Sequence, residues 1–254
     1  MVKIAVAVPE VIEGAVDKNF QTSIKHIDRA GAEGVDILLF PETALSGLAV
    51  TNIYENDCKN AISLDSVHVS EICKGAAKAG VWVGIGFLEQ FEEKLYDSAI
   101  LIDNVGNVKL HYRRMSEGWT WPNAPAAYGY GLEYPVADTP WGKAGFLICG
   151  DIFNASEHAA KAGLDLLLCP VACSFDFDLK NPQKDWEENF WPDYAAQFNK
   201  IGAYAVMSNY VEKQTDCHFH GGAHITNRHG VLLFSRPLYK PGLLIEEVEI
   251  NVQT

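Results

Sequence analysis

Short, continuous apolar segments recur along the chain and predict buried strands. The first two are residues 3–9 (KIAVAVP) and 37–42 (ILLFPE). Comparable segments occupy residues 81–90, 96–104, 108–114, 142–151, 164–171, 203–210, 223–236 and 243–250, and residues 223–236 read as a hairpin around Asn227–Gly230. Apolar runs of this length, without alternation, are typical of strands in sheets that are covered on both faces.

Amphipathic segments between these strands predict helices. Phe20, Ile24 and Ile27 recur at helical spacing. Three further helices are expected at residues 69–80, 155–163 and 194–202, the first of them ending at Gly80. Some neighbouring strands are joined by tight turns rather than by helices, at residues 91–94 and 104–107. This mixture favours a layered α/β fold with mixed sheets over a parallel barrel.

A long loop at residues 116–134 is rich in Trp, Pro, Gly and Tyr. Ordered loops of this length are often lids or pocket walls. Its aromatic side chains predict an apolar wall of a substrate site, or alternatively a dimer contact: Trp119, Trp121, Tyr128 and Tyr130. The sequence contains neither a low-complexity linker nor an internal repeat, so a single domain over residues 1–254 is expected.

Composition and charge exclude several classes of function. The net charge of −13 argues against a nucleic-acid partner, because phosphate binding requires a basic patch. No apolar run approaches the ~20 residues that span a bilayer. The first residues lack the features of a signal peptide, so a cytoplasmic location is expected. The six cysteines are then expected to be free thiols.

Cys149 ends an apolar run and is followed at once by Gly150 and Asp151, which favour turns. A cysteine in a strand is most often a small buried residue. At the end of a strand, however, its sulfur would face a cleft, and a backbone N–H beside it could bind an oxyanion. The sequence therefore allows either a buried thiol or a nucleophile.

Glu42 and two arginines stand at the ends of other predicted strands. Glu42 reads either as a surface carboxylate or as a general base whose pKa is raised by burial. Arg113 and Arg114 read either as a solvated pair or as one pocket residue and one outward residue, because adjacent strand residues point to opposite faces. Asn209, which ends another strand, is a turn former or orders the loops around a pocket.

A group of cysteine and histidine residues raises the alternative of a zinc site. Its members are Cys169, Cys173, Cys217, His218 and His220. None of them forms the tight Cys-x2-Cys spacing of a zinc knuckle. Buried thiols and pocket histidines are the preferred interpretation, so no metal is expected.

Five segments, taken in order, resemble the nitrilase or carbon–nitrogen hydrolase superfamily over nearly the whole chain. The segment LLFPETALSG is similar to the one that carries the family's glutamate, and LICGDIFNASEHAAKAGLDLLLCP to the one that carries its cysteine. YRRMSEGW occupies the place of the lysine segment. YAAQFNKIGAYAVMSN and HGGAHITNRHGVLL follow in the family's order.

The resemblance implies a four-layer α-β-β-α sandwich that commonly pairs into a dimer and uses no cofactor. It implies hydrolysis of small amides or nitriles by a Glu–Lys–Cys triad through an acyl-enzyme. Amides are favoured over nitriles. By motif, Glu42 is the base and Cys149 the nucleophile, and residues expected to bind substrate are Glu117, Gly150, Trp119 and Asn209.

The chain departs from the family pattern at three places. Arg114 stands where the lysine is expected, and Lys109 is several residues away. The family often has a second glutamate in the following loop, whereas Glu117 and Glu133 do not fall at its spacing. Gly150 replaces an aromatic or acidic residue, which removes a pocket wall.

Two hypotheses follow from the arginine. It can bind the oxyanion in place of lysine, so that the chain is a cytoplasmic amidase. Alternatively, its planar fork can grip Glu42, lower the pKa of that carboxyl and disable the base, which leaves a small-molecule binding or assembly protein. Retention of both Glu42 and Cys149 favours the enzyme.

Overall fold

The computed structural model describes residues 1–48, 50–175, 180–212 and 219–251. Its first sheet has the strand order β12-β1-β2-β3-β4-β5. The strands are β1 (Val2–Val8), β2 (Ile37–Leu39), β3 (Trp82–Phe91), β4 (Lys94–Ile102), β5 (Val108–Arg113) and β12 (Gly242–Val248). Strands β1, β2 and β3 are parallel, and the remaining pairs are antiparallel.

The second sheet repeats this plan with the order β11-β10-β9-β8-β7-β6. The strands are β6 (Ala137–Thr139), β7 (Gly142–Phe146), β8 (Leu166–Pro170), β9 (Tyr204–Ser208), β10 (Ala223–Thr226) and β11 (Leu232–Arg236). Strands β7, β8 and β9 are parallel, and antiparallel strands flank them on both sides.

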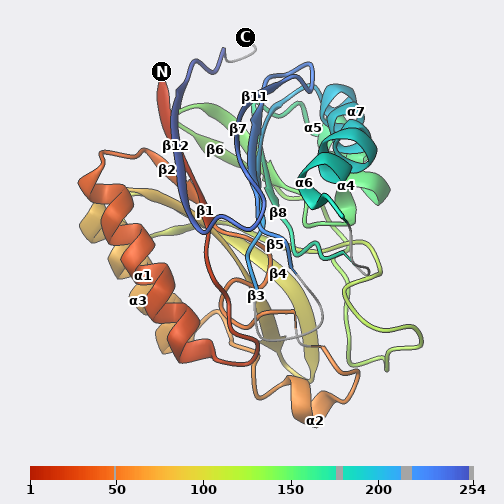
Figure 1. Ribbon diagram of the computed structural model, residues 1–254. Coiled ribbons are helices and arrows are strands. Elements are labelled where there is room, and N and C mark those ends of the chain that lie inside the picture. Colours follow the sequence, from red (N-terminus) through yellow and green to blue (C-terminus); the bar gives the residue numbers. More distant parts are fainter. Residues whose placement is uncertain (49, 176–179, 213–218, 252–254) are drawn as a thin grey trace.

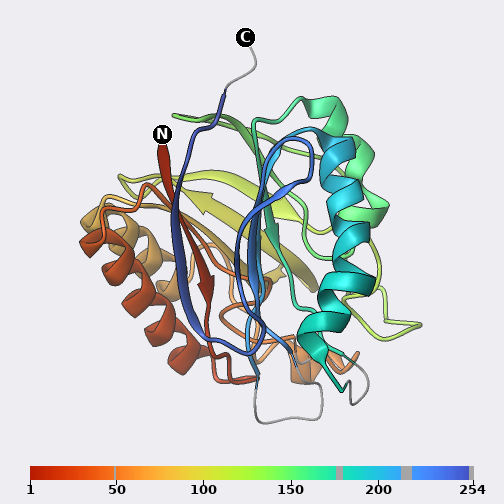
Figure 2. The same cartoon turned by 45° about the horizontal axis from the view of Figure 1, so that its top comes forward.

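The two sheets pack face to face, and helices cover their outer faces (Figure 1). Helices α1 (Val16–Ala32) and α3 (Val67–Ala79) lie on the first sheet, and α5 (Ser156–Ala162) and α7 (Trp191–Ile201) lie on the second (Figure 2). Shorter helical segments are α2 (Tyr54–Asp57), α4 (Asp151–Asn154), α6 (Pro182–Asp185) and the π-helical turn η1 (Trp186–Phe190). The predicted four-layer α-β-β-α sandwich is confirmed.

The inner faces of the two sheets form the central hydrophobic core. Val6 and Leu39 from the first sheet pack in the same cluster as Phe146 and Leu168 from the second, and all four are buried. Burying one such side chain contributes roughly 1.5–3 kcal/mol. Both sheets are therefore fixed relative to each other by apolar contacts, which sets the distance between residues at their ends.

Sheet polarity brings the ends of β2, β5 and β7 together. Strand β5 is antiparallel to β4, which is antiparallel to β3, so β5 ends at the same edge as the parallel β2. Glu42 follows β2, Arg114 follows β5, and Cys149 follows β7 of the facing sheet. The carboxyl ends of parallel strands commonly form binding sites in α/β folds.

Several predicted elements differ in extent from the structure. The strand expected over residues 142–151 ends at Phe146, because a turn and the short helix α4 begin before its last residues. The helix expected from residue 194 begins at Trp191, with Pro192 in its first turn, and is preceded by α6 and η1. The expected end of α3 is confirmed, since Gly80 adopts a left-handed C-cap.

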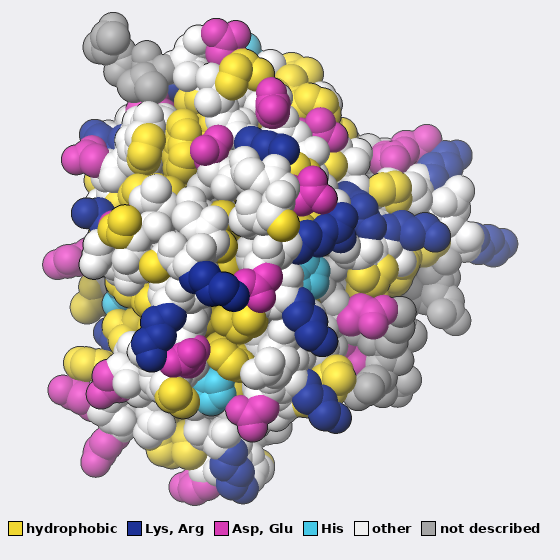
Figure 3. All heavy atoms as spheres, turned by 90° about the vertical axis from the view of Figure 1, so that its left-hand side faces the viewer, with side chains coloured by type: hydrophobic (Ala, Val, Ile, Leu, Met, Phe, Trp, Pro, Cys, Tyr) yellow, Lys and Arg dark blue, Asp and Glu magenta, His cyan; other side chains and the backbone are white. Residues whose placement is uncertain are grey.

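The surface on the side of α1 and α3 carries acidic and basic side chains interspersed with apolar ones (Figure 3). In the described part of the chain, no helix is both long and apolar enough to cross a membrane. The five described cysteines form no disulfide, as expected, and Cys217 lies outside the described residues.

We predict that Gly86→Ala destabilises the fold at the point where Glu42 is held. A Cβ at position 86 would lie 2.7 Å from the Pro41 carbonyl oxygen and 2.8 Å from the Glu42 Cα. The obstructing atoms belong to the backbone of residues 41–43, which leaves little room to relax. The free energy of unfolding should therefore fall by about 1–3 kcal/mol. Urea denaturation measures this change.

Gly75→Ala is the matched control. Gly75 lies within α3, and a Cβ there would meet the Ile24 Cδ1 at 3.4 Å, an ordinary contact. Alanine in a helix interior is favoured over glycine by roughly 0.5–1 kcal/mol. This variant should be as stable as the wild type or more stable. Equal destabilisation by both substitutions would contradict the role assigned to Gly86.

Candidate active site

Glu42 is fully buried immediately after β2. The next residue, Thr43, has a φ of 44°, a left-handed conformation that turns the chain sharply. Gly86 on the neighbouring strand β3 allows the Pro41–Glu42 backbone to approach it closely. The backbone of Glu42 is thus fixed by the turn at Thr43 and by the close approach to Gly86. The carboxyl group faces Cys149 of the second sheet.

Arg114 places its guanidinium between the two sheets. Its Nη1 donates to Glu42 Oε1 at 2.8 Å and lies 3.4 Å from Asp97 Oδ2. Its Nε donates to Ser116 Oγ at 3.2 Å, and its Nη2 donates to the Glu117 carbonyl oxygen at 3.1 Å. Arg114 therefore holds Glu42 through one nitrogen, not through a bidentate fork.

Arg113 points to the other face of β5, as predicted from strand geometry. Its Nε and Nη2 donate to the Glu89 carboxylate at 2.9 and 2.7 Å, and its guanidinium stacks over the Tyr96 ring. Burial would raise the pKa of Glu89, but hydrogen bonds from Arg113, His111 and Ser98 lower it to about 2. This ion pair is separate from the site around Arg114.

Cys149 has a strained backbone conformation. Its φ is 46°, which is uncommon for a residue with a side chain and costs roughly 1–3 kcal/mol. The conformation is held by the Cys149 N–H, which donates to the Pro170 carbonyl oxygen at 3.0 Å, and by α4, which begins two residues later. The strain turns the side chain out of the sheet toward the end of β8.

The thiol of Cys149 contacts a second thiol, that of Cys173. A hydrogen bond with Cys173, together with burial, raises the pKa of Cys149 well above its ordinary value. The charge of Arg114 and a backbone N–H of Ala172 act in the opposite direction but do not prevail. The charge of Arg114 is therefore not sufficient to bring the pKa of the Cys149 thiol below its ordinary value.

Cys173 is in turn bonded to Tyr194, whose hydroxyl oxygen lies 3.2 Å from the Cys173 sulfur. Its hydrogen bonds with Cys149 and Tyr194 lower the pKa of the Cys173 thiol, although burial opposes them. Cys149, Cys173 and Tyr194 therefore form a chain of interacting groups beside Glu42.

The pKa of Glu42 is raised to about 8. Burial is the largest cause, the Cys149 thiol beside it adds to the effect, and Arg114 opposes both. Arg114 lowers the pKa of Glu42, but desolvation of the fully buried carboxyl outweighs this one ion pair, so the net shift is upward, as expected for a buried base. The Glu42 carboxylate, where it is ionised, is consequently basic enough to accept a proton near neutral pH.

Gly150 does not leave a gap in the site. A Cβ at this position would lie 2.6 Å from Arg114 Nη2 and 3.2 Å from Ser116 Oγ. The space of the missing side chain is filled by the guanidinium, so the expected loss of a pocket wall is corrected. The arginine and the glycine, which are two separate departures in sequence, form one arrangement in space.

Asp151 joins the segment after Cys149 to the segment after Arg114. It is fully buried and accepts hydrogen bonds from the Ser116 N–H at 2.7 Å, the Met115 N–H at 3.2 Å and the Tyr112 hydroxyl at 2.6 Å. Each bond to a charged group typically contributes ~1.5–3 kcal/mol. Asp151 therefore fixes the position of the arginine relative to the cysteine.

Asn209 orders the loop that carries Cys173. Its Oδ1 accepts from the Cys173 N–H at 3.2 Å, and its Nδ2 donates to the Cys173 and Gly221 carbonyl oxygens at 3.0 and 3.2 Å. Of the two interpretations for this residue, the ordering of loops matches the structure. Asn209 acts on the site through Cys173.

Trp119 and Glu117 lie on the loop that follows Arg114. Trp119 is buried and packs against Tyr128 and Tyr130, while Glu117 is exposed and contacts Arg114 through its backbone. A cavity of about 440 Å³ is lined by Glu13, Leu48, Val50, Thr51, Gly118, Trp119, Thr120 and Trp121. It lies between the loops that follow Glu42 and Arg114.

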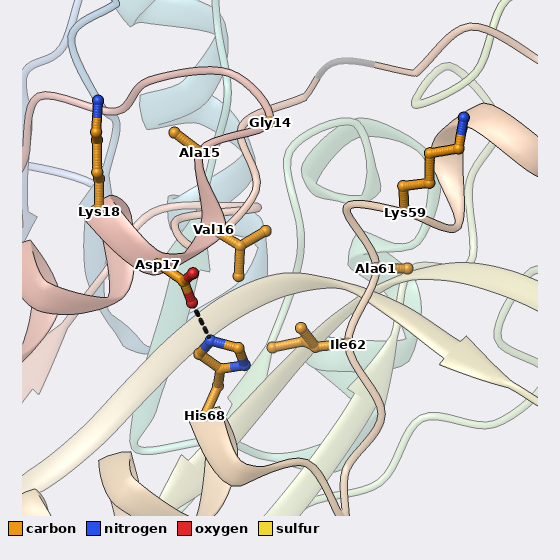
Figure 4. Close-up of a pocket in the computed structure, with 9 residues that line it drawn as sticks. All are labelled: Gly14, Ala15, Val16, Asp17, Lys18, Lys59, Ala61, Ile62 and His68. Carbon is orange, nitrogen blue, oxygen red and sulfur yellow. Dashed lines mark hydrogen bonds and ion pairs between the residues drawn. The ribbon is translucent and has the colours of Figure 1, made fainter.

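Another surface cavity lies at the start of α1 (Figure 4). It is lined by residues such as Lys18, Lys59 and Ile62, and Asp17 bonds His68 across its edge at 2.9 Å. Glu42, Arg114 and Cys149 are not among its lining residues.

The described members of the possible zinc group, Cys169, Cys173 and His220, are not grouped as metal ligands, although the His220 N–H donates to the Cys173 carbonyl oxygen at 3.4 Å. Within the described residues, no three His, Cys, Asp or Glu side chains are grouped to hold a metal. Cys169 is buried in the core under α7, and His220 stacks on Phe175. Cys217 and His218 lie outside the described residues.

Sequence reasoning missed four residues of the site: Asp97, Asp151, Cys173 as a partner of Cys149, and Tyr194. A signal existed for Asp97, because a carboxyl inside the apolar strand segment YDSAILID is unusual without a partner. The contact of Cys149 with Cys173 depends on the pairing of β7 with β8, which no local pattern encodes.

Curated proteins that resemble the chain include nitrilases and formamidases by name. A nitrilase from Talaromyces marneffei is 28% identical over 68% of the chain and 56% of its own length. A formamidase from Photorhabdus laumondii is 29% identical over 76% of the chain and 57% of its own length. The chain thus spans about half the length of the curated relatives it matches.

Solved structures establish the shared fold. An amidase from Nesterenkonia sp. AN1 superposes with a TM-score of 0.82 at 21% identity, covering 98% of this chain and 93% of the other. A glutamine-dependent NAD+ synthetase from Acinetobacter baumannii superposes at 0.75 and 22% identity, covering 96% of this chain and 45% of the other.

A glutamate-to-glutamine mutant of the same amidase, with acrylamide added at its active-site cysteine, superposes at 0.80 and 21% identity, with 98% of this chain and 94% of the other covered. The family model for carbon–nitrogen hydrolases matches residues 3–253. With this match over nearly its whole length, the chain belongs to the carbon–nitrogen hydrolase family.

Proposed function

We propose that this protein hydrolyses non-peptide carbon–nitrogen bonds and acts as an amidase of small amides. The observation that carries the proposal is the convergence of Glu42, Arg114 and Cys149 from three strand ends. Amides are preferred to nitriles because most of the similar proteins are named as formamidases or amidases. No cofactor is needed for this chemistry.

In the first half-reaction, the Cys149 sulfur attacks the amide carbon and Glu42 takes the thiol proton. The C–S bond forms, the carbonyl oxygen becomes an oxyanion, and the C–N bond then breaks. Glu42 returns its proton to the leaving nitrogen, which departs as ammonia or an amine. The raised pKa of Glu42 suits a group that must both accept and release a proton near pH 7.

In the second half-reaction, water attacks the thioester and Glu42 removes the water proton. The C–S bond breaks, the acid is released and the thiol is restored. Arg114 stays charged throughout: burial opposes its charge, but Glu42, Cys149 and Asp97 hold its pKa above the ordinary value. Its Nη2 lies close to the Gly150 backbone and is a candidate donor to the oxyanion, together with the Gly150 N–H.

The cavity that Trp119 and Gly118 line is proposed as the approach for the substrate. Gly118 connects it to the catalytic group, because a Cβ there would lie 3.5 Å from Arg114 Nη2. In this arrangement Trp119 supplies an apolar wall, while Glu117 contributes its backbone and Asn209 positions the Cys173 loop. These side chains suit a small, uncharged substrate.

A catalytically disabled protein is the second candidate, and the ion pair of 2.8 Å between Arg114 and Glu42 favours it. A base that is engaged by a permanent cation is a weaker base. The protein would then bind small molecules or support an assembly without turnover. Location in the cytoplasm stays a prediction from the sequence in either case.

We predict that Arg114→Lys lowers the rate of ammonia release. Lysine has a shorter reach and a single nitrogen, so it cannot contact Glu42, Asp97 and the Glu117 carbonyl at once. Loss of one oxyanion donor typically reduces kcat by about 10²–10³. The measurement is ammonia release from a panel containing formamide, acetamide, propionamide and acetonitrile.

Arg113→Lys is the matched control, because Arg113 pairs with Glu89 on the other face of β5 and does not contact Glu42. It should keep the wild-type rate within a few fold. A rise in ammonia release on Arg114→Lys, abolished by adding Cys149→Ala, would instead identify the wild type as the disabled form.

We predict that Cys173→Ala shifts the alkylation of Cys149 to lower pH. The hydrogen bond with Cys173 is the largest cause of the raised Cys149 pKa. Removing it allows the thiolate, which is the reactive form, to be populated at lower pH. The pH dependence of iodoacetamide labelling, resolved by peptide mapping, measures the midpoint. Cys73→Ala on α3 should leave the midpoint unchanged, and an unchanged midpoint in Cys173→Ala would refute the assignment.

We propose that the protein assembles as a homodimer or a larger homo-oligomer. The hairpin of β10 and β11 exposes the apolar side chains of Val231, Leu232 and Leu233. Two-fold pairing of identical surfaces is the commonest way to bury such groups. Sedimentation at micromolar concentration should show a species larger than the monomer, and a monomer alone would contradict the proposal.

A further inference from the structure

Two carboxyl groups and one cation are buried together at the centre of the site. The exposed fractions are 0% for Glu42, 1% for Asp97 and 4% for Arg114. A single guanidinium nitrogen, Arg114 Nη1, lies 2.8 Å from Glu42 Oε1 and 3.4 Å from Asp97 Oδ2. With both carboxyls ionised, the trio would carry one uncompensated negative charge away from water, which is strongly unfavourable.

Hydrogen bonding leads to the same conclusion as the charge count. Glu42 Oε2 and Asp97 Oδ1 are buried, and neither has a hydrogen-bond donor among the described residues. The two carboxyl groups also face each other directly. A proton on one of them would provide the missing donor and remove the excess charge.

The backbone holds Asp97 in this position. Asp97 lies in β4, and the Arg114 N–H donates to its carbonyl oxygen at 2.8 Å, immediately beyond the pairing of Ser98 with Arg113. The register of β4 with β5 therefore sets the distance between the second carboxyl and the guanidinium. Arg114 is the one cation that the described residues place in an ion pair with either carboxyl.

We propose that Glu42 and Asp97 form a carboxyl pair that retains a single proton against Arg114, with Asp97 as the positioning residue that sets the proton affinity of Glu42. The proton count stands on the geometry alone, whereas its consequence for catalysis rests on the proposed function. In the resting site the proton lies on Asp97 and is donated to the Glu42 carboxylate, so the base is ionised yet not fully neutralised by the arginine.

Electrostatics supports this assignment. Burial raises the pKa of both carboxyls, that of Asp97 well above its ordinary value. Glu42 raises the pKa of Asp97 further, whereas the hydrogen bond from Asp97 lowers the pKa of Glu42, and Arg114 lowers both. Two interacting carboxyls lose their protons in two steps that belong to the pair. Other titratable groups facing the pair are Cys149, Cys173, Asp151, Tyr194 and Tyr210.

The total charge of the site stays constant during the proposed proton transfers, because each proton moves between groups within the site. When Glu42 accepts the thiol proton, the negative charge moves to the sulfur and then to the oxyanion, both beside Arg114. A neutral Asp97 does not repel this charge, whereas an ionised one would. Asp97 therefore favours the anionic intermediates without contacting the substrate.

Infrared spectroscopy of the whole protein at pH 7 tests the proton count, because a protonated carboxyl has a separate carbonyl stretch. The wild type should show one such buried group. Both Glu42→Gln and Asp97→Asn should abolish the band, because the remaining carboxyl then pairs one-to-one with Arg114 and ionises. Asp103→Asn, which changes a carboxyl at the turn before β5, should leave the band unchanged.

Isotopic labelling keeps the test valid if a variant does not fold. In the wild type, ¹³C-carboxyl labelling of aspartate should shift the band, because the proton resides on Asp97. Absence of the band from the wild type, its persistence in Asp97→Asn, or its insensitivity to aspartate labelling would overturn the proposal. None of these readings requires a substrate, so they do not depend on the proposed activity.

The pH profile of kcat/KM tests the consequence for the base. In Asp97→Ala, Glu42 loses the hydrogen bond that the neutral Asp97 donates and that lowers its pKa, so the pKa of Glu42 should rise and the acid limb should move to higher pH. The rate at pH 7 should fall about tenfold, because less of the base is ionised. A uniform loss of rate without displacement of the acid limb would assign Asp97 a structural role only and contradict its positioning role.

Discussion

The buried contact of Arg114 with two carboxyl groups is the interaction on which the site depends. It connects the ends of β2, β4 and β5, and the guanidinium extends from there to the segment after Cys149. Removing one partner of such a buried group would leave a charge without compensation, which typically costs ~3–5 kcal/mol. The same contact therefore contributes to the stability of this end of the sandwich and determines the charge of the site.

The position of Cys149 is set by the second sheet, to which its own strand β7 belongs. The left-handed backbone of Cys149 directs the thiol toward Cys173, which Asn209 holds through both its N–H and its carbonyl group. Asp151 then connects the segment after Cys149 to Met115 and Ser116. The two halves of the site are positioned independently by their own sheets and are joined by a few buried polar contacts.

The departures from the family pattern are correlated in space. Arg114 is longer than lysine and branches, and Gly150 provides the room for its Nη2. Ser116 accepts from Nε, and Asp97 supplies a second carboxyl near Nη1. A guanidinium with this many buried partners is not interchangeable with an ammonium group. The residues around Arg114 therefore match an arginine at this position, not a lysine.

The sequence by itself determined the order of strands and helices, the layered α/β class, and the positions of Glu42, Arg114 and Cys149 at strand ends, because hydrophobic periodicity and turn residues are local signals. It also determined that Arg113 and Arg114 face opposite ways, since the strand period is two residues. Only the tertiary structure decided that Gly150 accommodates Arg114, that Cys173 lies against Cys149, and that Asp97 joins Glu42. The tertiary structure also decided that burial outweighs Arg114 in setting the pKa of Glu42, and that Cys173 raises the pKa of Cys149, because burial and contacts between distant strands are not encoded in a local pattern.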